Sequence, residues 1–147
     1  MTAENKALIQ RFCEVVNTKN FAAVEGFVED FFAVNYVAHE NSKPGTSVSH
    51  RGIKQYLNRF YAVMPDLHIT VEDLVAEGDK VVIRWTMRGT HAGEFMGSAP
   101  TGNSVTVKAI ECFRIADGRI VERWSNWDQL ALLQQLGVLP LAGENKK

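Results

Sequence analysis

The spacing of apolar residues changes once along this chain, near Pro65, and that change limits the possible folds more than any other feature. Before Pro65 the apolar residues recur at helical intervals, which predicts helices over residues 4–17, 21–28 and 53–64. After Pro65 they alternate with polar residues, which predicts strands over residues 67–76, 81–90, 105–115 and 120–126. Helices followed by a run of strands are typical of an α+β domain and not of a βαβ repeat.

Two short turns arrange the predicted strands as an antiparallel meander. Gly78-Asp79 joins the first two strands and Asp117-Gly118 joins the last two, and both pairs are typical of β-hairpins. A helix over residues 129–136 closes the chain and ends at Gly137. Residues 31–38 favour a short strand or extended segment, and residues 41–49 favour a loop. We therefore expect about four main strands plus a short one, forming a curved antiparallel sheet. Three N-terminal helices and a short C-terminal helix would wrap it around a conical pocket.

Length and charge narrow the class of protein. A chain of 147 residues is most simply one domain, with an ordered core over about residues 5–140 and a polar tail over residues 143–147. The net charge of −1, without a basic stripe, argues against nucleic acid and membrane surfaces as partners. No apolar run reaches the length of a membrane span or signal peptide, which predicts a cytoplasmic protein. Cys13, Cys112 and the scattered histidines show no disulfide or metal-ligand spacing.

The last hairpin determines which side chains share a face. If Asp117-Gly118 is a simple two-residue turn, Glu111 lies opposite Trp124 and Val107 lies opposite Asp128. Alternation then places one set of side chains on the face that covers the pocket: Val107, Ala109, Glu111, Phe113, Ile120, Glu122, Trp124, Asn126 and Asp128. Lys108, Arg114 and Arg123 would occupy the solvated face. A three-residue loop with a bulge would instead shift the pairing by one and place Arg123 opposite Glu111.

Glu111 and Asp128 are the main catalytic candidates. A carboxyl group among indole and aliphatic side chains loses hydration, which raises its pKa and suits it to acid–base catalysis near neutral pH. The two acids would then divide the roles, one protonated and the other ionised. For Asp128 the competing interpretation is an N-cap of the closing helix. For Glu111 it is an internal salt bridge, with an arginine as partner.

Arg84 and His91 are further catalytic candidates. If Gly78-Asp79 is a tight turn, Arg84 lies opposite Asp73, and an ion pair competes with a role in holding a substrate oxygen. His91 lies where a strand enters a glycine-containing loop, near the expected pocket mouth. The candidates for substrate binding are aromatic or polar residues near the strand ends and in that loop, which would act as a lid: His39, Trp85, Phe95, Met96, Trp124 and Asn126.

Motifs over about residues 5–140 make the chain similar to a known family. They include Pro65-Asp66-Leu67, Glu77-Gly78-Asp79-Lys80-Val81-Val82, Arg84-Trp85-Thr86, Asp117-Gly118-Arg119-Ile120-Val121-Glu122 and the ending Trp127-Asp128-Gln129-Leu130 followed by Leu133-Gln134-Gln135-Leu136-Gly137. In these motifs the chain resembles the SnoaL-like polyketide cyclases.

The resemblance implies a nuclear-transport-factor-2-like cone with a deep pocket, a homo-oligomer (dimer or tetramer) and a cofactor-free enzyme. It implies proton transfer and aldol-type ring closure on a hydrophobic carbonyl or ester substrate, with Asp128 matching the family's pocket aspartate. Glu111 and His91 are weaker matches. The same fold also hosts isomerases, dehydratases, epoxide hydrolases and non-catalytic proteins that bind hydrophobic small molecules.

Overall fold

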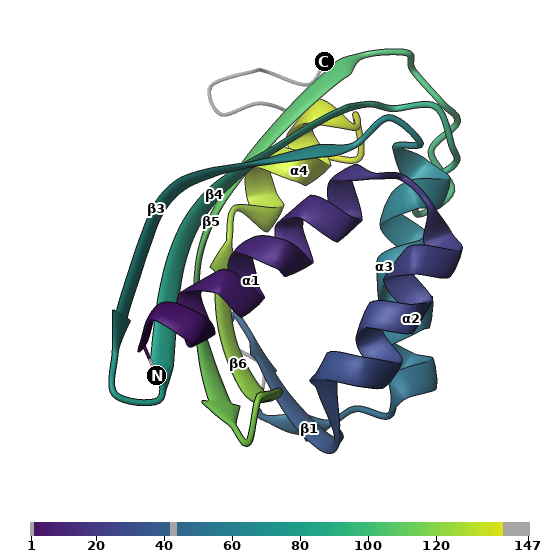
Figure 1. Cartoon of the computed structure of the whole chain (residues 1–147). Coiled ribbons are helices and arrows are strands. Elements are labelled where there is room, and N and C mark those ends of the chain that lie inside the picture. The colour runs from purple at the N-terminus through teal and green to yellow at the C-terminus, as the bar shows by residue number, and fades with distance from the viewer. Residues whose placement is uncertain (1, 42–43, 140–147) are drawn as a thin grey trace.

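A curved sheet of six strands forms one side of the molecule, and helices cover its concave face (Figure 1). The computed structural model describes residues 2–41 and 44–139. The elements, in chain order, are α1 (Thr2–Asn17), α2 (Phe21–Phe31), β1 (Phe32–Glu40), β2 (Thr46–Ser47), α3 (His50–Val63), β3 (His68–Glu77), β4 (Lys80–Thr90), β5 (Ser104–Ala116), β6 (Arg119–Trp127) and α4 (Gln129–Gln135). The predicted α+β class, helices and strands are confirmed, with small differences at their ends.

The sheet is mixed, which corrects the prediction of a purely antiparallel sheet. Its order is β2-β1-β6-β5-β4-β3, and β3 to β6 form the expected antiparallel meander. Strand β1, however, pairs with β6 in parallel, and β2 adds a short antiparallel edge. The predicted loop over residues 41–49 therefore contains β2, and its residues 42 and 43, like the polar tail, lie outside the described residues. Alternation within single strands carries no information on this pairing, since β1 and β6 are far apart in the sequence.

A bulge in β6 corrects the predicted register of the last hairpin. Ala116 pairs with Arg119 and Ile115 with Ile120, as a two-residue turn requires. The register then shifts, and Glu111 lies opposite Ser125 instead of Trp124. A one-residue shift turns the side chains that follow to the opposite face. Arg123, predicted to be solvated, therefore points into the molecule, whereas the predicted inward orientation of Glu122, Trp124, Asn126 and Asp128 is wrong.

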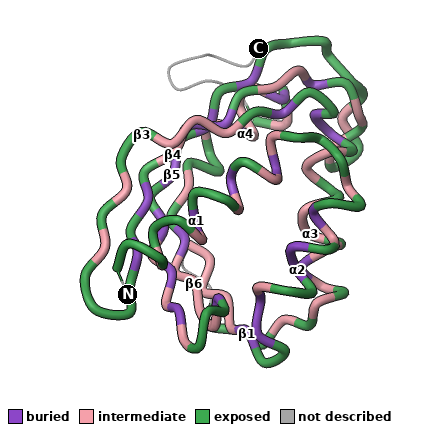
Figure 2. The backbone as a smooth tube through the Cα atoms, viewed as in Figure 1, coloured by how far each residue is buried: buried purple, intermediate pink, exposed green. Residues whose placement is uncertain are grey.

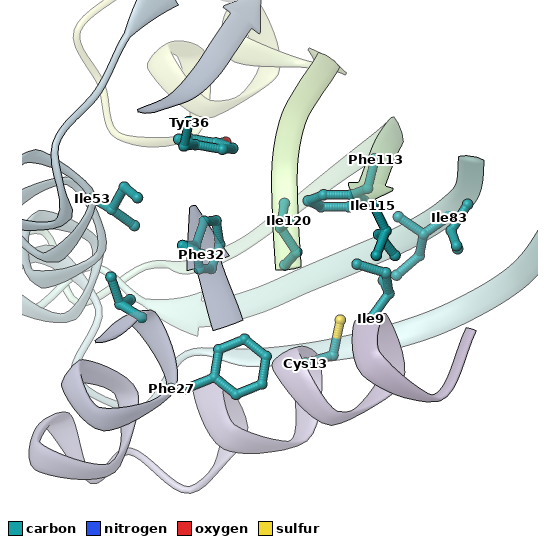
Figure 3. Close-up of a cluster of buried hydrophobic side chains, with 12 residues drawn as sticks. Ile9, Cys13, Phe27, Phe32, Tyr36, Ile53, Ile83, Phe113, Ile115 and Ile120 are labelled. Carbon is teal, nitrogen blue, oxygen red and sulfur yellow. The ribbon is translucent and has the colours of Figure 1, made fainter. Parts of the chain in front are cut away.

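The core lies between the sheet and the helices. Figure 2 marks buried residues on both the strands and the helices, and Figure 3 shows the cluster that joins α1, α2 and α3 to the strands. In that cluster Ile9 and Cys13 of α1 approach Ile83, Ile115 and Phe113 of the sheet. A second cluster, which includes Leu132 and Leu136 from the C-terminal end, packs around Met87 and Val107. Within the described ranges, no helix combines the length and apolar character needed to cross a lipid bilayer.

Candidate functional site

Two adjoining lobes form a cavity between the helices and the sheet. The lobe next to α1, called here the α1 lobe, has a volume of about 100 Å³, and the lobe next to α3, called the α3 lobe, about 350 Å³. They share the lining residues Phe12, Tyr56, Leu57, Phe113 and Arg123. The walls are mainly aromatic and aliphatic, with a few polar groups among them, as in pockets that bind small molecules.

The polar groups gather at the boundary of the two lobes, in a junction cluster of Glu40, Tyr56, Glu111 and Arg123. These residues come from the end of β1, from α3, from β5 and from β6, respectively. Arg123 Nη1 donates to Glu111 Oε2 at 2.9 Å, and Nη2 donates to Glu40 Oε1 at 3.4 Å. The guanidinium also lies over the ring of Tyr56, 5.5 Å from its centroid. The buried guanidinium of Arg123 thus contacts residues from β1, α3 and β5 at the boundary of the two lobes.

Burial alone would lower the pKa of Arg123, but its neighbours more than reverse that effect. Tyr36, Glu111, Tyr56 and Glu40 together raise the pKa of Arg123 above its ordinary value. The guanidinium therefore stays charged, as a buried cation between carboxylates requires. With one cation and two carboxylates, the junction cluster has a surplus of one acid.

Glu111 is fully occupied by hydrogen-bond donors. Its Oε1 accepts from Trp85 Nε1 at 2.7 Å, and its Oε2 accepts from both Ser125 Oγ at 2.7 Å and Arg123 Nη1. The side chain is buried, and the salt bridge considered as its alternative role is present. Glu111 thus lies at the wall of the α1 lobe, where it neutralises and orients Arg123.

Glu40 accepts hydrogen bonds at only one of its two carboxylate oxygens, whereas Glu111 accepts them at both. Tyr56 Oη donates to Glu40 Oε1 at 2.5 Å, and Arg123 donates to the same atom. Oε2 has no hydrogen-bond partner among the described residues. Glu40 lines the α3 lobe, and its side chain is 23% exposed, so a ligand in that lobe can contact this residue.

Buried tyrosines and a thiol complete the chemistry of the walls. Burial raises the pKa of Tyr36 to about 12 and also raises the pKa of Tyr56, so both hydroxyls remain protonated at neutral pH. Burial likewise raises the pKa of the Cys13 thiol to about 12, which makes a thiolate nucleophile unfavourable there. The site therefore offers carboxylate and phenol groups for proton transfer.

Two N–H groups on the wall lack an acceptor. Arg123 Nε and Trp127 Nε1 are both buried and have no hydrogen-bond partner among the described residues. Both residues line the α1 lobe, and Arg123 also lines the α3 lobe. A buried donor without an acceptor is unfavourable, because the free energy of removing it from water is not offset by a hydrogen bond.

Of the ten sequence-predicted site residues, Trp85 and Glu111 line this cavity. Asp128 does not: it is exposed, and its Oδ1 accepts from Ala131 N at 3.0 Å. Its predicted inward orientation is therefore wrong, and the alternative N-cap is present at the start of α4. The predicted role of Asp128 in proton transfer stays a prediction, and this geometry gives it no support.

Arg84 and His91 also lie away from the lining of both lobes. Arg84 is exposed and pairs with Asp73, Nε to Oδ2 at 2.7 Å, so the predicted cross-strand pairing is confirmed. His91 is fully buried, and its Nδ1 lies 3.0 Å from Oγ1 of Thr101 within the loop that it begins. Their predicted catalytic roles stay predictions.

The remaining candidates lie on the outer face of the sheet or in the loop after β4. His39 stacks on Trp124 with ring centroids 5.2 Å apart, and its Nε2 lies 2.7 Å from Glu122 Oε2. Asn126 is exposed. Phe95 packs against the second core cluster, whereas Met96 is 70% exposed. None of these residues lines either lobe, and their roles in substrate binding, like the lid, stay predictions.

Four residues of the site were not among the predicted site residues: Arg123, Tyr56, Glu40 and Ser125. The bulge in β6 hides the inward orientation of Arg123 and Ser125, because strict alternation places them outside. Tyr56 had a detectable signal, since it lies three residues after Ile53 on the apolar stripe of α3. Within residues 2–41 and 44–139, no three His, Cys, Asp or Glu side chains are grouped as metal ligands.

Comparison with known proteins places this geometry in context. The family model described as SnoaL-like polyketide cyclase matches residues 6–136. AclR from Streptomyces galilaeus, provisionally named a hydroxylase, is 30% identical with a TM-score of 0.83, over 98% of this chain and 87% of AclR. IdmH from Streptomyces antibioticus, provisionally named a polyketide cyclase, is 32% identical with a TM-score of 0.76, over 90% of this chain and 98% of IdmH.

A structure from Jannaschia sp. CCS1 supports the fold alone. It is 21% identical with a TM-score of 0.81, and the match covers 95% of each chain. A comparison with curated proteins found no match.

Proposed function

The chain belongs to the SnoaL-like polyketide cyclase family, and from that membership we propose that it is a cofactor-free enzyme that closes a ring on a hydrophobic carbonyl or ester substrate. The single observation that supports this proposal most is the junction cluster. It places a carboxylate with one unpartnered oxygen beside a protonated phenol and a buried cation, on the wall of an aromatic cavity. These are the groups that an intramolecular aldol reaction uses.

Glu40 acts as the base in this proposal. Its Oε2 removes a proton from the carbon next to the substrate carbonyl, and the positive charge of the Arg123 guanidinium stabilises the enolate oxygen. The enolate carbon then attacks a second carbonyl, which forms the new C–C bond and leaves an alkoxide. Glu40 Oε2 returns its proton to that alkoxide, while the Tyr56 hydroxyl donates to Oε1 and holds the carboxyl group in place. The proton balance closes without an external acid.

Exchange of hydrogen for deuterium tests the base without knowledge of the natural substrate. In D₂O the protein should accelerate exchange at the acidic carbon of 2-tetralone, a bicyclic ketone, as followed by proton NMR. Glu40→Gln keeps the size of the side chain and removes the base, so the accelerated rate should fall by about 10²- to 10⁴-fold. Asp128→Asn is the matched control, since it makes the same chemical change outside the cavity. Equal losses in both variants, or none in Glu40→Gln, would contradict the proposal.

A non-catalytic protein that binds a hydrophobic small molecule is the second candidate. The observation in its favour is that both acids predicted from the sequence are engaged, Glu111 by three donors and Asp128 as a helix cap. This candidate predicts that 2-tetralone binds and that its exchange rate stays at the level of the buffer.

We also propose that the protein is a homo-oligomer that uses the outer face of the sheet. A row of apolar side chains crosses that face through the paired residues Val75, Val82, Cys112 and Trp124. Val75 is 62% exposed, and Ile110 nearby is 56% exposed. Such a patch is typical of a surface that another subunit covers. Light scattering should give a mass above one chain, and Val75→Lys should lower it. A monomeric wild type would contradict the assignment.

A further inference from the structure

The α3 lobe has an inner end and a mouth that differ in character. Buried side chains form the inner end, among them Phe32, Tyr36 and Phe113. The exposed residues of the lining mark the mouth: Pro44, Thr46, Gln55 and Arg59. The lobe therefore suits a ligand whose apolar part enters the cavity while a polar part stays near water.

Helix α3 supplies two hydrogen-bond donors to this mouth. Gln55 and Arg59 lie four residues apart on α3, so their side chains are neighbours on one face of the helix. Neither side chain makes a hydrogen bond or ion pair within residues 2–41 and 44–139. Arg59 carries a positive charge, and Gln55 carries an amide with two N–H bonds. The mouth thus presents a guanidinium and an amide to the same acceptor.

The charges of the lobe favour an anion at the mouth and disfavour one deeper inside. Arg123, the other cation among the described lining residues, is already engaged by Glu111 and Glu40. Arg59 has no such carboxylate partner in the part of the chain that the structure describes. Glu40 and Glu111 would repel a second anion placed at the junction cluster. A ligand with one acid group is therefore oriented with its apolar end inward and its acid at Arg59.

From these observations we propose that the mouth of the α3 lobe binds a carboxylate, and that Arg59 and Gln55 donate hydrogen bonds to it. The chemical class of the ligand is a hydrophobic monocarboxylate. The inference rests on the proposed function, since it places one end of the substrate in the same cavity. It adds that this substrate carries a free acid group away from the carbon that Glu40 deprotonates.

The experiment compares octanoate with octanamide, which has the same carbon chain and no charge. Each probe is titrated into the full chain at neutral pH and followed in ¹H–¹⁵N spectra. Octanoate should bind about 3- to 10-fold more tightly and should shift the side-chain N–H signals of Arg59 and Gln55. Added salt should reduce this preference, because the contact lies close to water.

A pair of variants on α3 separates the site from a general effect of charge. Arg59→Gln removes the cation, so octanoate should bind about as weakly as octanamide, whose own affinity should change little. Arg51→Gln is the matched control, since Arg51 is an exposed residue of the same helix and lines neither lobe. It makes the same chemical change and should leave the preference for octanoate intact.

Three results would overturn the carboxylate site. These are equal affinities of the wild type for the two probes, equal losses of preference in Arg59→Gln and Arg51→Gln, and failure of both probes to bind. The wild-type comparison needs no variant, so the inference remains testable if Arg59→Gln does not fold. A preference for octanoate without accelerated deuterium exchange in 2-tetralone would support the site and contradict the proposed catalysis. Accelerated exchange without the preference would do the reverse.

Discussion

Two acids close to β6 occupy opposite environments. Glu111, opposite Ser125, is buried and accepts hydrogen bonds from an indole, a hydroxyl and a guanidinium. Asp128, just after the end of β6, is exposed and accepts a backbone N–H of α4. The difference teaches that an acid beside aromatic residues in the sequence does not by itself identify an acid in a pocket. Whether a carboxylate enters the cavity depends on which face of the strand it occupies.

The first prediction tests the buried side of this comparison and has the largest expected effect. Arg123→Met leaves the carboxylate of Glu111 buried without its cation, which should lower the free energy of unfolding by about 3–5 kcal/mol. Denaturation in urea, followed by circular dichroism, measures the change. The double variant Glu111→Gln with Arg123→Met should recover much of the loss, because the buried charge of Glu111 is removed together with its cation and only the partly exposed Glu40 stays ionised.

Arg84→Met is the control for this prediction. The Arg84–Asp73 pair lies on the exposed face, so its loss should cost about 0–1 kcal/mol. If Arg123→Met cost no more than Arg84→Met, the junction cluster would be as weakly coupled as a surface pair, and the contrast between the two environments would fail.

The second prediction tests the exposed side. Asp128→Ala removes the cap of α4 and should lower the free energy of unfolding by about 1 kcal/mol, whereas Asp128→Asn should have little effect because asparagine also caps helices. Both variants should keep the wild-type exchange rate with 2-tetralone. A loss of about 10²- to 10⁴-fold in Asp128→Asn, with stability unchanged, would return Asp128 to the role that its sequence motif predicts.

The third prediction, with the smallest effect, concerns Glu122, the neighbour of Arg123 on the opposite face. The hydrogen bond from His39, with a smaller contribution from Arg114, lowers the pKa of Glu122 below its ordinary value of 4.5. A lowered folded-state pKa stabilises the fold above pH 4.5, and this contribution is lost as the pH falls through the folded-state pKa. Unfolding free energies measured from neutral to acidic pH should therefore fall less steeply in Glu122→Gln. Parallel curves for the two proteins would contradict this.

Most of the fold was predictable because it depends on local signals. The change of spacing near Pro65 predicted the order of helices and strands, and the Gly78-Asp79 turn placed Asp73 opposite Arg84. The parallel pairing of β1 with β6 was not predictable in this way. It joins segments about 80 residues apart, and neither strand carries a pattern that specifies its neighbour.

The site was predictable only in part. Trp85 and Glu111 were placed in the pocket because they lie on regular stretches of β4 and β5. Arg123 was not, because a single extra residue in β6 reverses the faces beyond it. Glu40 became a candidate base only when α3 brought Tyr56 beside it.

The sequence by itself determined the family, the class of fold and the order of its elements, since these follow from periodicity, turns and motifs along the chain. Only the tertiary structure decided which carboxylates enter the cavity and which lie in water. The physical reason is that the environment of a side chain depends on strand register and on contacts between distant segments. Such contacts form only when the sheet and helices pack together.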